Sequence, residues 1–353
     1  MFMEQLDETL QIFSNAHGVS GYEGNINQLL EKKLRPYTDE IKTDKMGNLI
    51  AIRKRGSPSI MIAAHMDEIG LMVKYVDENG FLHFVKLGGW FDQTLHSQRV
   101  ILHTEKGDIY GVIGAKPPHA MKEEERKKPV EAENMFIDIG AKDKEDALKM
   151  GVIPGVTATL DRQFTRLGNN RVTGKAFDDR AGCVMMIEAM RLIHEMDVDA
   201  TVYAVGTVQE EVGLKGARTS AFGLDPDVAI VSEVTVSGDH PGIEKKHSAV
   251  ELGKGPAITI VDAAGRGLIV TEKVIKWLKE TAQTENIEIQ LDVADGGTTD
   301  ATAIHLTKSG IPSAVISVPS RYIHSPVEVV DLEDLKKSAD LIAFAVQSAS
   351  KYF

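Results

Sequence analysis

The spacing of apolar residues predicts different kinds of structure in different parts of the chain. Near the start, Leu6, Leu10 and Phe13 recur at helical spacing, and a second helical stretch covers residues 26–34. Residues 59–64 are continuously apolar, which is typical of a strand buried on both faces in the middle of a parallel or mixed sheet. The chain therefore begins as an α/β unit in which helices pack on a sheet.

Between about residues 70 and 164 the pattern changes to short alternating segments separated by turn residues, and helical spacing is nearly absent outside residues 144–150. Such spacing predicts a small β-barrel or sandwich. The charged stretch 121–128 (MKEEERKK) is expected to be a mobile, solvated loop. The expected strands of this region are 71–76, 81–85, 99–103, 109–113 and 135–139.

From residue 170 onward, expected helices and strands alternate, which is the βαβ pattern of an α/β sheet with helices on both faces. The helices are expected at 181–196, 215–222, 272–284, 301–308 and 332–350, and the strands at 201–208, 228–232, 257–261, 287–291 and 313–318. We therefore expect one α/β catalytic domain with a mixed sheet, made of residues 1–69 and 165–353. A β-rich domain, residues 70–164, would be inserted into it.

Composition narrows the range of functions. The 353 residues carry a formal net charge of −12, which argues against binding to nucleic acid or to anionic lipid. No apolar run reaches the length of a membrane helix, and the first thirty residues are too polar for a signal peptide. The single cysteine, Cys183, excludes an internal disulfide and a thiolate-rich zinc site. We expect a cytoplasmic protein.

Candidate catalytic residues follow the expected strands. His65 comes directly after the buried strand, where open α/β sheets bind their ligands, and Asp67 is placed to accept a hydrogen bond from the second imidazole nitrogen. Glu210 and Glu211 follow the strand 201–208, so that one could bind a metal while the other takes a proton.

Three further candidates are Asp178 at a helix start, Glu233 after the strand 228–232, and His324 after the strand 313–318. Taken singly, such residues are often ordinary helix-terminal or solvent-exposed groups. Without Asp67, the set holds two imidazoles and four carboxylates, which suit zinc, cobalt or manganese. Five ligands and a base suffice for two ions about 3.5–4 Å apart that share a bridging carboxylate and a hydroxide.

These residues lie in motifs that resemble the co-catalytic metal aminopeptidases of the tetrahedral (TET) type, a family that also holds glutamyl and deblocking aminopeptidases and proteins labelled endoglucanase M. The resemblance runs almost from end to end. The motifs that carry it are VSGYEG (19–24), AHMDEIG (64–70), FDDRAG (177–182), QEEVGLKGA (209–217), DGGTTDA (295–301) and YIHSP (322–326).

The resemblance implies a role for each residue. His65 and Glu233 would hold one metal, Glu211 and His324 would hold the other, and Asp178 would bridge the two metals. The peptide bond between Asp178 and Asp179 would be cis. Glu210 would be the general base and Asp67 the partner of His65. The family commonly has aspartate where Glu233 stands, which leaves the preferred metal open. The inserted domain would be PDZ-like, and dimers formed through it would assemble into a tetrahedral dodecamer.

The expected function is hydrolysis of the first residue of short peptides by a metal-bridged hydroxide. A metal-dependent N-acyl amino acid deacylase is the alternative that the metal centre alone does not exclude. A glycosidase needs two carboxylates and no metal, which would leave His65 and His324 without a purpose. A non-catalytic scaffold would lack a ligand or the base, and none is missing. Lys175, Lys254 and Arg321 are candidates for recognition of an acidic first residue.

Overall fold

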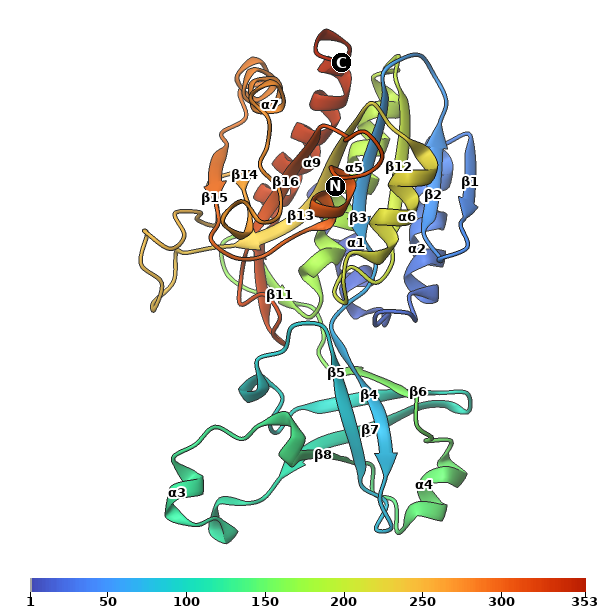
Figure 1. Cartoon of the computed structure of the whole chain (residues 1–353), viewed down its shortest axis with the longest axis vertical. Helices are drawn as coiled ribbons and strands as arrows, with labels where there is room; N and C mark the ends of the chain where they lie inside the picture. Colours follow the sequence, from blue (N-terminus) through green and yellow to red (C-terminus); the bar gives the residue numbers. More distant parts are fainter. Residues whose placement is uncertain (1) are drawn as a thin grey trace.

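The computed structural model describes residues 2–353 and divides into a larger α/β unit and a smaller barrel below it (Figure 1). The chain enters the barrel directly from a strand of the large sheet and returns to that sheet after residue 160. Two separate hydrophobic clusters fill the two parts. That these parts are domains bounded at residues 69/70 and 164/165 stays a prediction.

The large sheet is mixed, and its centre is parallel. Its main path runs in the order β1, β2, β12, β3, β13, β16, β17, β11, β10, and β12, β3, β13 and β16 are parallel neighbours. The strands are β1 (Glu40–Thr43), β2 (Leu49–Arg53), β3 (Ser59–His65), β10 (Thr165–Arg166), β11 (Arg171–Gly174), β12 (Thr201–Thr207), β13 (Val228–Val236), β14 (Ala257–Val261), β15 (Gln290–Val293), β16 (Ser313–Arg321) and β17 (Glu328–Asp331).

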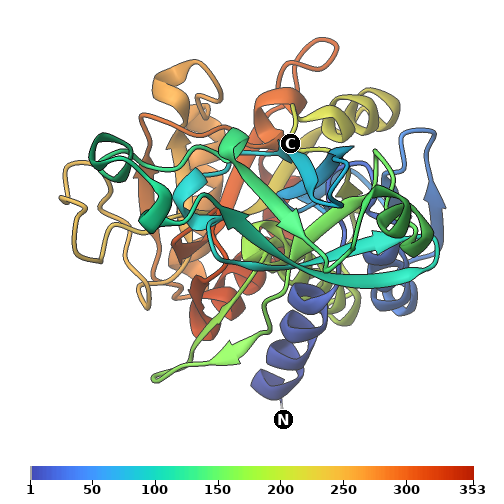
Figure 2. The same cartoon turned by 90° about the horizontal axis from the view of Figure 1, so that it is seen from below.

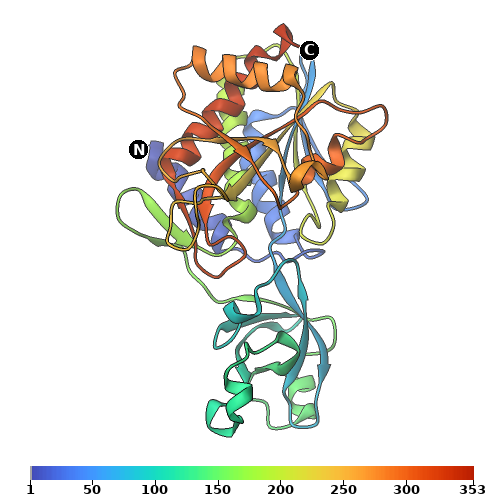
Figure 3. The ribbon, with the colours of Figure 1, turned by 60° about the vertical axis from the view of Figure 1, so that its left-hand side comes forward.

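Helices cover both faces of this sheet, as the alternating pattern predicted (Figure 3). One face carries α1 (Phe2–Asn15), α2 (Gly24–Leu34), α5 (Phe177–Glu195) and α9 (Leu332–Ser348). The other carries α6 (Lys215–Leu224) and α8 (Asp300–Ile304), while α7 (Glu272–Thr284) packs on α9 and β16. Helix α5 is apolar around most of its circumference because it lies between the sheet and its neighbouring helices.

The segment with alternating residues forms a closed six-stranded barrel, which lies in front of the larger unit in Figure 2. Its strands pair in the order β4, β5, β8, β7, β6, β9, and Leu82, Leu102 and Ile137 lie in its core. The elements are β4 (Gly70–Val76), β5 (Leu82–Leu87), β6 (Arg99–Thr104), β7 (Gly107–Ala115), α3 (Glu123–Arg126), β8 (Met135–Asp138), α4 (Lys144–Met150) and β9 (Thr157–Leu160).

Some expected element bounds were wrong. The charged stretch 121–128 is exposed as predicted, but it contains the single helical turn α3. Helix α8 is shorter than expected and β15 begins three residues later. Strand β13 continues to Val236, so Glu233 lies inside a strand. The strand is longer because it keeps pairing with β16 after its pairing with β3 has ended.

The carboxyl ends of the parallel strands point toward the barrel (Figures 1 and 3). Strand β3 ends at His65, and the segments after β12 and β16 lead to Glu210 and His324. Residues from segments far apart in the sequence therefore meet where the large sheet faces the barrel, which is where ligands of open α/β sheets bind.

Candidate active site

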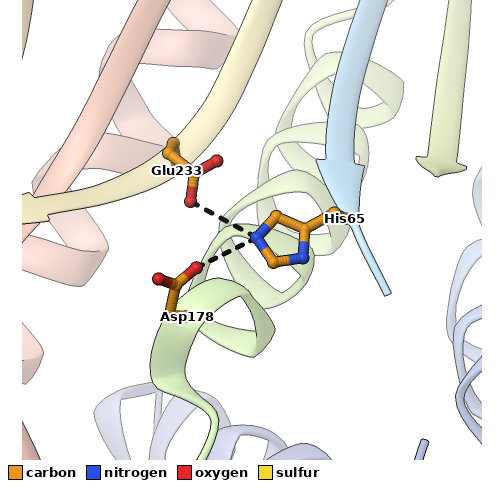
Figure 4. A group of neighbouring side chains, drawn as sticks. All are labelled: His65, Asp178 and Glu233. Carbon is orange, nitrogen blue, oxygen red and sulfur yellow. Dashed lines mark hydrogen bonds and ion pairs between the residues drawn. The ribbon is translucent and has the colours of Figure 1, made fainter. Parts of the chain in front are cut away.

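His65 is buried at the end of β3, and its ring orientation is fixed by the neighbouring backbone. Its Nδ1 lies 3.1 Å from the backbone carbonyl oxygen of Asp67, so Nδ1 carries the proton and Nε2 is left as the ligand atom. Nε2 faces Asp178 Oδ1 at 2.9 Å and Glu233 Oε1 at 3.8 Å (Figure 4). One imidazole and two carboxylates thus converge on a single point.

The pairing register explains why Glu233 reaches His65. Ala63 of β3 is paired with Val231 of β13, the last pair before the two strands diverge. Two residues further along, both strands have advanced equally, so His65 and Glu233 lie at the same level, with their side chains facing each other where the strands have separated.

A second group of ligand atoms lies on the other side of Asp178. His324 Nε2 is 3.2 Å from Asp178 Oδ2 and 3.2 Å from Glu211 Oε1. The two oxygens of Asp178 therefore face different histidines, Oδ1 toward His65 and Oδ2 toward His324. This is the arrangement expected of a carboxylate that bridges two cations.

The backbone around these residues departs from regular structure. Asp178 and Asp179 have non-helical dihedral angles at the start of α5, and the peptide bond between them is cis, as the resemblance implied. Gln209 and His324 have φ angles of 55° and 60°, in the left-handed region that residues other than glycine rarely adopt. Asp178 is not an ordinary helix-capping residue: the N-cap residue is Ala176, and no side chain caps the helix.

Asp67 contacts His65 differently from our expectation. Its carboxylate oxygen Oδ1 lies 3.6 Å from His65 Nδ1, too far for a hydrogen bond, and its backbone carbonyl accepts that bond instead. The carboxylate accepts hydrogen bonds from the backbone N–H groups of Glu210 (2.9 Å) and Glu211 (3.2 Å) and from the Ser20 hydroxyl (2.6 Å). Asp67 therefore holds the turn that carries the two glutamates.

Glu210 lies beside the ligand groups without forming a hydrogen bond to either histidine. Its Oε2 is 4.0 Å from His65 Nε2, and the side chain is largely buried. Burial raises its pKa well above the usual range, and the negative charges of Asp300, Glu233 and Glu211 raise it further against the opposing effect of His65. A raised pKa suits a group that must both accept and return a proton.

The donor set fits divalent cations. The site contains three groups of possible ligands, and within each group the ligand atoms lie no more than 4.8 Å apart. These groups are His65 with Asp178 and Glu233, His65 with Glu210 and Glu211, and Asp178 with Glu211 and His324. Glu211 Oε1 is buried and accepts no hydrogen bond, and burial together with nearby carboxylates raises the pKa of Glu233 well above its usual range. A bound cation would give the Glu211 oxygen a partner and would offset the effects that raise the pKa of Glu233.

Residues of the barrel close one side of the site. Trp90 and Leu160 line a cleft together with Asp178, Glu211 and His324. A β-carbon on Gly89 would lie 2.9 Å from His324 Nδ1. The site is therefore bounded by both parts of the chain.

Sequence reasoning missed three buried carboxylates near the site. Glu68 pairs with Lys175 (2.7 Å) and Arg180 (3.3 Å), Asp300 accepts a hydrogen bond from Thr207, and Glu328 accepts from two backbone N–H groups of the site. The signals were present but weak: Glu68 directly follows Asp67, Asp300 lies in the DGGTTDA stretch, and Glu328 interrupts an apolar run of valines.

Two of the three cations expected to recognise an acidic substrate already have carboxylate partners. Lys175 is buried against Glu68, and Arg321 forms a two-pronged ion pair with Asp239, with a shortest contact of 2.6 Å. Lys254 lies exposed. None of these positions supports the expected recognition role.

Comparison with known proteins identifies the family. Residues 47–341 match the M42 glutamyl aminopeptidase family. The chain belongs to this family. The lysyl aminopeptidase of Pyrococcus furiosus is 37% identical over 95% of this chain and 94% of its own. The fold of aminopeptidase APDkam598 from Desulfurococcus kamchatkensis, 45% identical, superposes with a TM-score of 0.93 over 98% of this chain and 96% of that one. The TET1 peptidase of Pyrococcus horikoshii, 36% identical, superposes with a TM-score of 0.87 over 97% of this chain and 99% of that one.

Membership of the M42 family makes this protein a peptidase, and specifically a metal-dependent aminopeptidase, as the motifs predicted. The mixed α/β fold is likewise shared with the TET peptidases. Across residues 2–353, the helices are either too short or too polar to cross a bilayer.

Proposed function

We propose that this M42 peptidase removes the first residue of short peptides at the cluster formed by His65, Asp178, Glu211, Glu233 and His324, with Glu210 as the general base. The observation that carries the proposal is the division of the two Asp178 oxygens between the two histidines. A single cation would not require a carboxylate that faces both sides, whereas two cations would.

The cofactors of the proposal are two divalent ions for each subunit, most simply zinc or cobalt, with manganese as a third choice. His65, Asp178 and Glu233 would hold one ion, and Asp178, Glu211 and His324 the other. When bound, the ions would lower the pKa of water and polarise the carbonyl group of the scissile bond.

The side chains of this chain would perform the proton transfer. Glu210, fixed through its backbone N–H to Asp67, takes a proton from the attacking water at a carboxylate oxygen. It then returns that proton to the leaving amine. Asp67 would act by positioning: it keeps the turn at Glu210 and Glu211 in place through both backbone N–H groups.

The cleft supports cleavage at the end of a peptide. Trp90 and Leu160 of the barrel segment limit the space beside Asp178, Glu211 and His324. The free amino terminus of a peptide would bind near the cation held by Asp178, Glu211 and His324, and the chain beyond the scissile bond would leave toward solvent. An acylated amino terminus would have no free amine to bind there.

For the assembly, we propose dimers that associate into a tetrahedral dodecamer in the cytoplasm, with the barrel as a PDZ-like dimerisation domain. A solved relative of 36% identity and TM-score 0.86 is described as a dodecamer, and the P. horikoshii TET1 peptidase as a tetrahedron or a large octahedral shell. A barrel that carries Tyr110 and Val112 exposed on one strand has apolar surface to bury against a copy of itself.

The test is a panel of aminoacyl-p-nitroanilides, each also in N-acetylated form, assayed with metal-free enzyme and after addition of zinc, cobalt or manganese. We expect hydrolysis of the free-amine substrates only, and only with metal. Release of acetate from the N-acetylated forms, in place of nitroaniline from the free-amine forms, would support the deacylase instead. Activity that persists after complete metal removal would contradict both assignments.

A further inference from the structure

Glu328 is a buried carboxylate that belongs to neither group of proposed ligands. It is the first residue of β17, is 2% exposed, and is paired in the sheet with Gly174 of β11. Its neighbours Val327, Val329 and Val330 are apolar. A carboxylate in such a strand loses its hydration, so its presence calls for partners that compensate.

Those partners are the backbones of two proposed ligands. Glu328 Oε2 accepts a hydrogen bond from the backbone N–H of Asp178 at 3.0 Å, and Oε1 accepts one from the backbone N–H of His324 at 3.0 Å. Asp178 and His324 belong to different segments, one at the start of α5 and the other in the loop between β16 and β17. One rigid group therefore links the backbones from which both ligands extend.

The backbone is irregular at both ends of this link. Asp178 has extended, non-helical angles at the beginning of a helix, and His324 has a φ angle of 60°. The left-handed conformation of His324 persists only when the surrounding structure holds it in place. Because the two carboxylate oxygens keep a fixed separation, the distance between the two ligand backbones is limited by the same group.

We propose that Glu328 is a positioning residue that sets the separation of Asp178 and His324, and thereby the affinity of the cation group formed by Asp178, Glu211 and His324. The proposal rests on the proposed function, because it assumes that this group binds a cation. Glu328 itself would touch neither cation nor substrate. Replacement by glutamine keeps the size of the side chain but turns one acceptor into a donor that faces an N–H group.

The chain offers a matched control. Asp334 is a buried carboxylate in α9 that also accepts two backbone N–H groups, those of Gly253 and Gly255, and neither glycine is a site residue. Asp334→Asn makes the same chemical change as Glu328→Gln. It should lower the free energy of unfolding to a similar degree and leave metal binding unchanged.

The experiment titrates metal-free wild type, E328Q, D334N and His324→Ala with zinc, and measures stoichiometry, Kd and the midpoint of urea unfolding. We expect the zinc site whose affinity falls in H324A to lose roughly 10- to 100-fold in affinity in E328Q as well, the usual effect of removing a group that orients metal ligands. At zinc concentrations between the two Kd values kcat should fall, and at saturating zinc it should recover with KM near the wild-type value.

Zinc affinity of E328Q within twofold of wild type would overturn the proposal, even if its unfolding midpoint fell as in D334N. Should E328Q fail to fold, Glu328→Asp is titrated instead, and at least threefold weaker binding is expected; wild-type affinity would again overturn the proposal. If H324A binds both zinc ions as wild type does, the proposed site is wrong and the inference falls with it. If H324A binds weakly and E328Q normally, only the inference falls.

Discussion

At the scale of single residues, Glu210 and Glu211 show how two adjacent side chains with the same chemistry acquire different tasks. Both backbone N–H groups are held by Asp67, so the turn is fixed, and the side chains then diverge. Glu211 Oε1 lies 3.2 Å from His324 Nε2, whereas Glu210 remains beside His65 at 4.0 Å. Their position, and not their identity, decides which one is free to move a proton.

Replacement of Glu210 by glutamine should separate proton transfer from metal binding. The variant keeps the size of the side chain and removes the base, so kcat should fall roughly 10²- to 10⁴-fold. Metal content measured by mass spectrometry should stay at the wild-type level. Glu211→Gln is the contrasting variant, and we expect it to lose bound metal. Wild-type activity in E210Q would mean that another group accepts the proton.

At the scale of elements, the segment between β5 and β6 of the barrel approaches the site at Gly89. A β-carbon at Gly89 would lie 2.9 Å from Nδ1 and 3.1 Å from Cε1 of His324, so even a methyl group would displace the ring. The barrel therefore fixes the position of a proposed ligand that comes from the large sheet.

The Gly89→Ala variant should lower kcat/KM by roughly 10²-fold, since a displacement of about 1 Å at a reacting centre has effects of this size. The melting temperature should change little, because the methyl group meets a side chain at the edge of the cleft. Gly223→Ala is the control, since nothing lies within 4 Å of a β-carbon in that position of α6. A kcat/KM equal to that of the control would show that His324 tolerates the shift.

A second contact between the large unit and the barrel involves His17, and its contribution to stability depends on pH. His17, which follows α1, has Nδ1 2.8 Å from the hydroxyl of Thr159 in β9, and this hydroxyl is 2.9 Å from Nε2 of His103 in β6. Burial, together with the positive charge of Lys175, lowers the pKa of His17 to about 4, against the opposing charges of Glu68 and Asp108. His17 is thus neutral in the folded protein at pH 5.

The unfolded chain binds a proton at His17 near its ordinary pKa of 6.5, so between pH 6.5 and 4 the unfolded state holds more protons. This contribution to stability is complete above pH 6.5 and is lost as the pH falls toward 4. Urea unfolding at pH 7, 5.5 and 4.5 should therefore show a smaller loss of stability on acidification in His17→Gln than in wild type. Equal pH dependence of the two proteins would contradict this assignment.

At the scale of the whole molecule, the proposed cation site lies where the sheet faces the barrel. Ligands come from the large unit, while Trp90 and Gly89 come from the barrel segment. A bound cation would draw these segments together and hold the barrel in one position relative to the sheet. An interface that uses both parts would then be better ordered with metal than without.

We therefore expect a dodecamer in buffer that contains metal and dimers after chelation. The formal net charge of −12 opposes close association of copies, so dissociation should be more extensive at low ionic strength. Multi-angle light scattering before and after chelation, with zinc added back as the control, measures this directly. A mass of 38.6 kDa under every condition would exclude the assembly, though not the peptidase assignment.

Much of the fold follows from local patterns. The apolar run 59–64 was identified as a central strand, and the alternating residues after 70 as a barrel or sandwich, because periodicity is set by nearest neighbours along the chain. The candidate residues could also be found, since histidines and acids that follow strands meet at one edge of a parallel sheet. Element bounds near the site were less predictable, as the length of β13 shows.

The sequence by itself determined the element types, the acidic and imidazole groups of the site and, through its motifs, the family. Only the tertiary structure decided the distances: that Ala63 pairs with Val231 and so sets His65 opposite Glu233, that the oxygens of Asp178 divide between two histidines, and that Glu328 links their backbones. The physical reason is that strand register and the distances between ligands from different segments are set by contacts between residues more than one hundred positions apart, which no local pattern records.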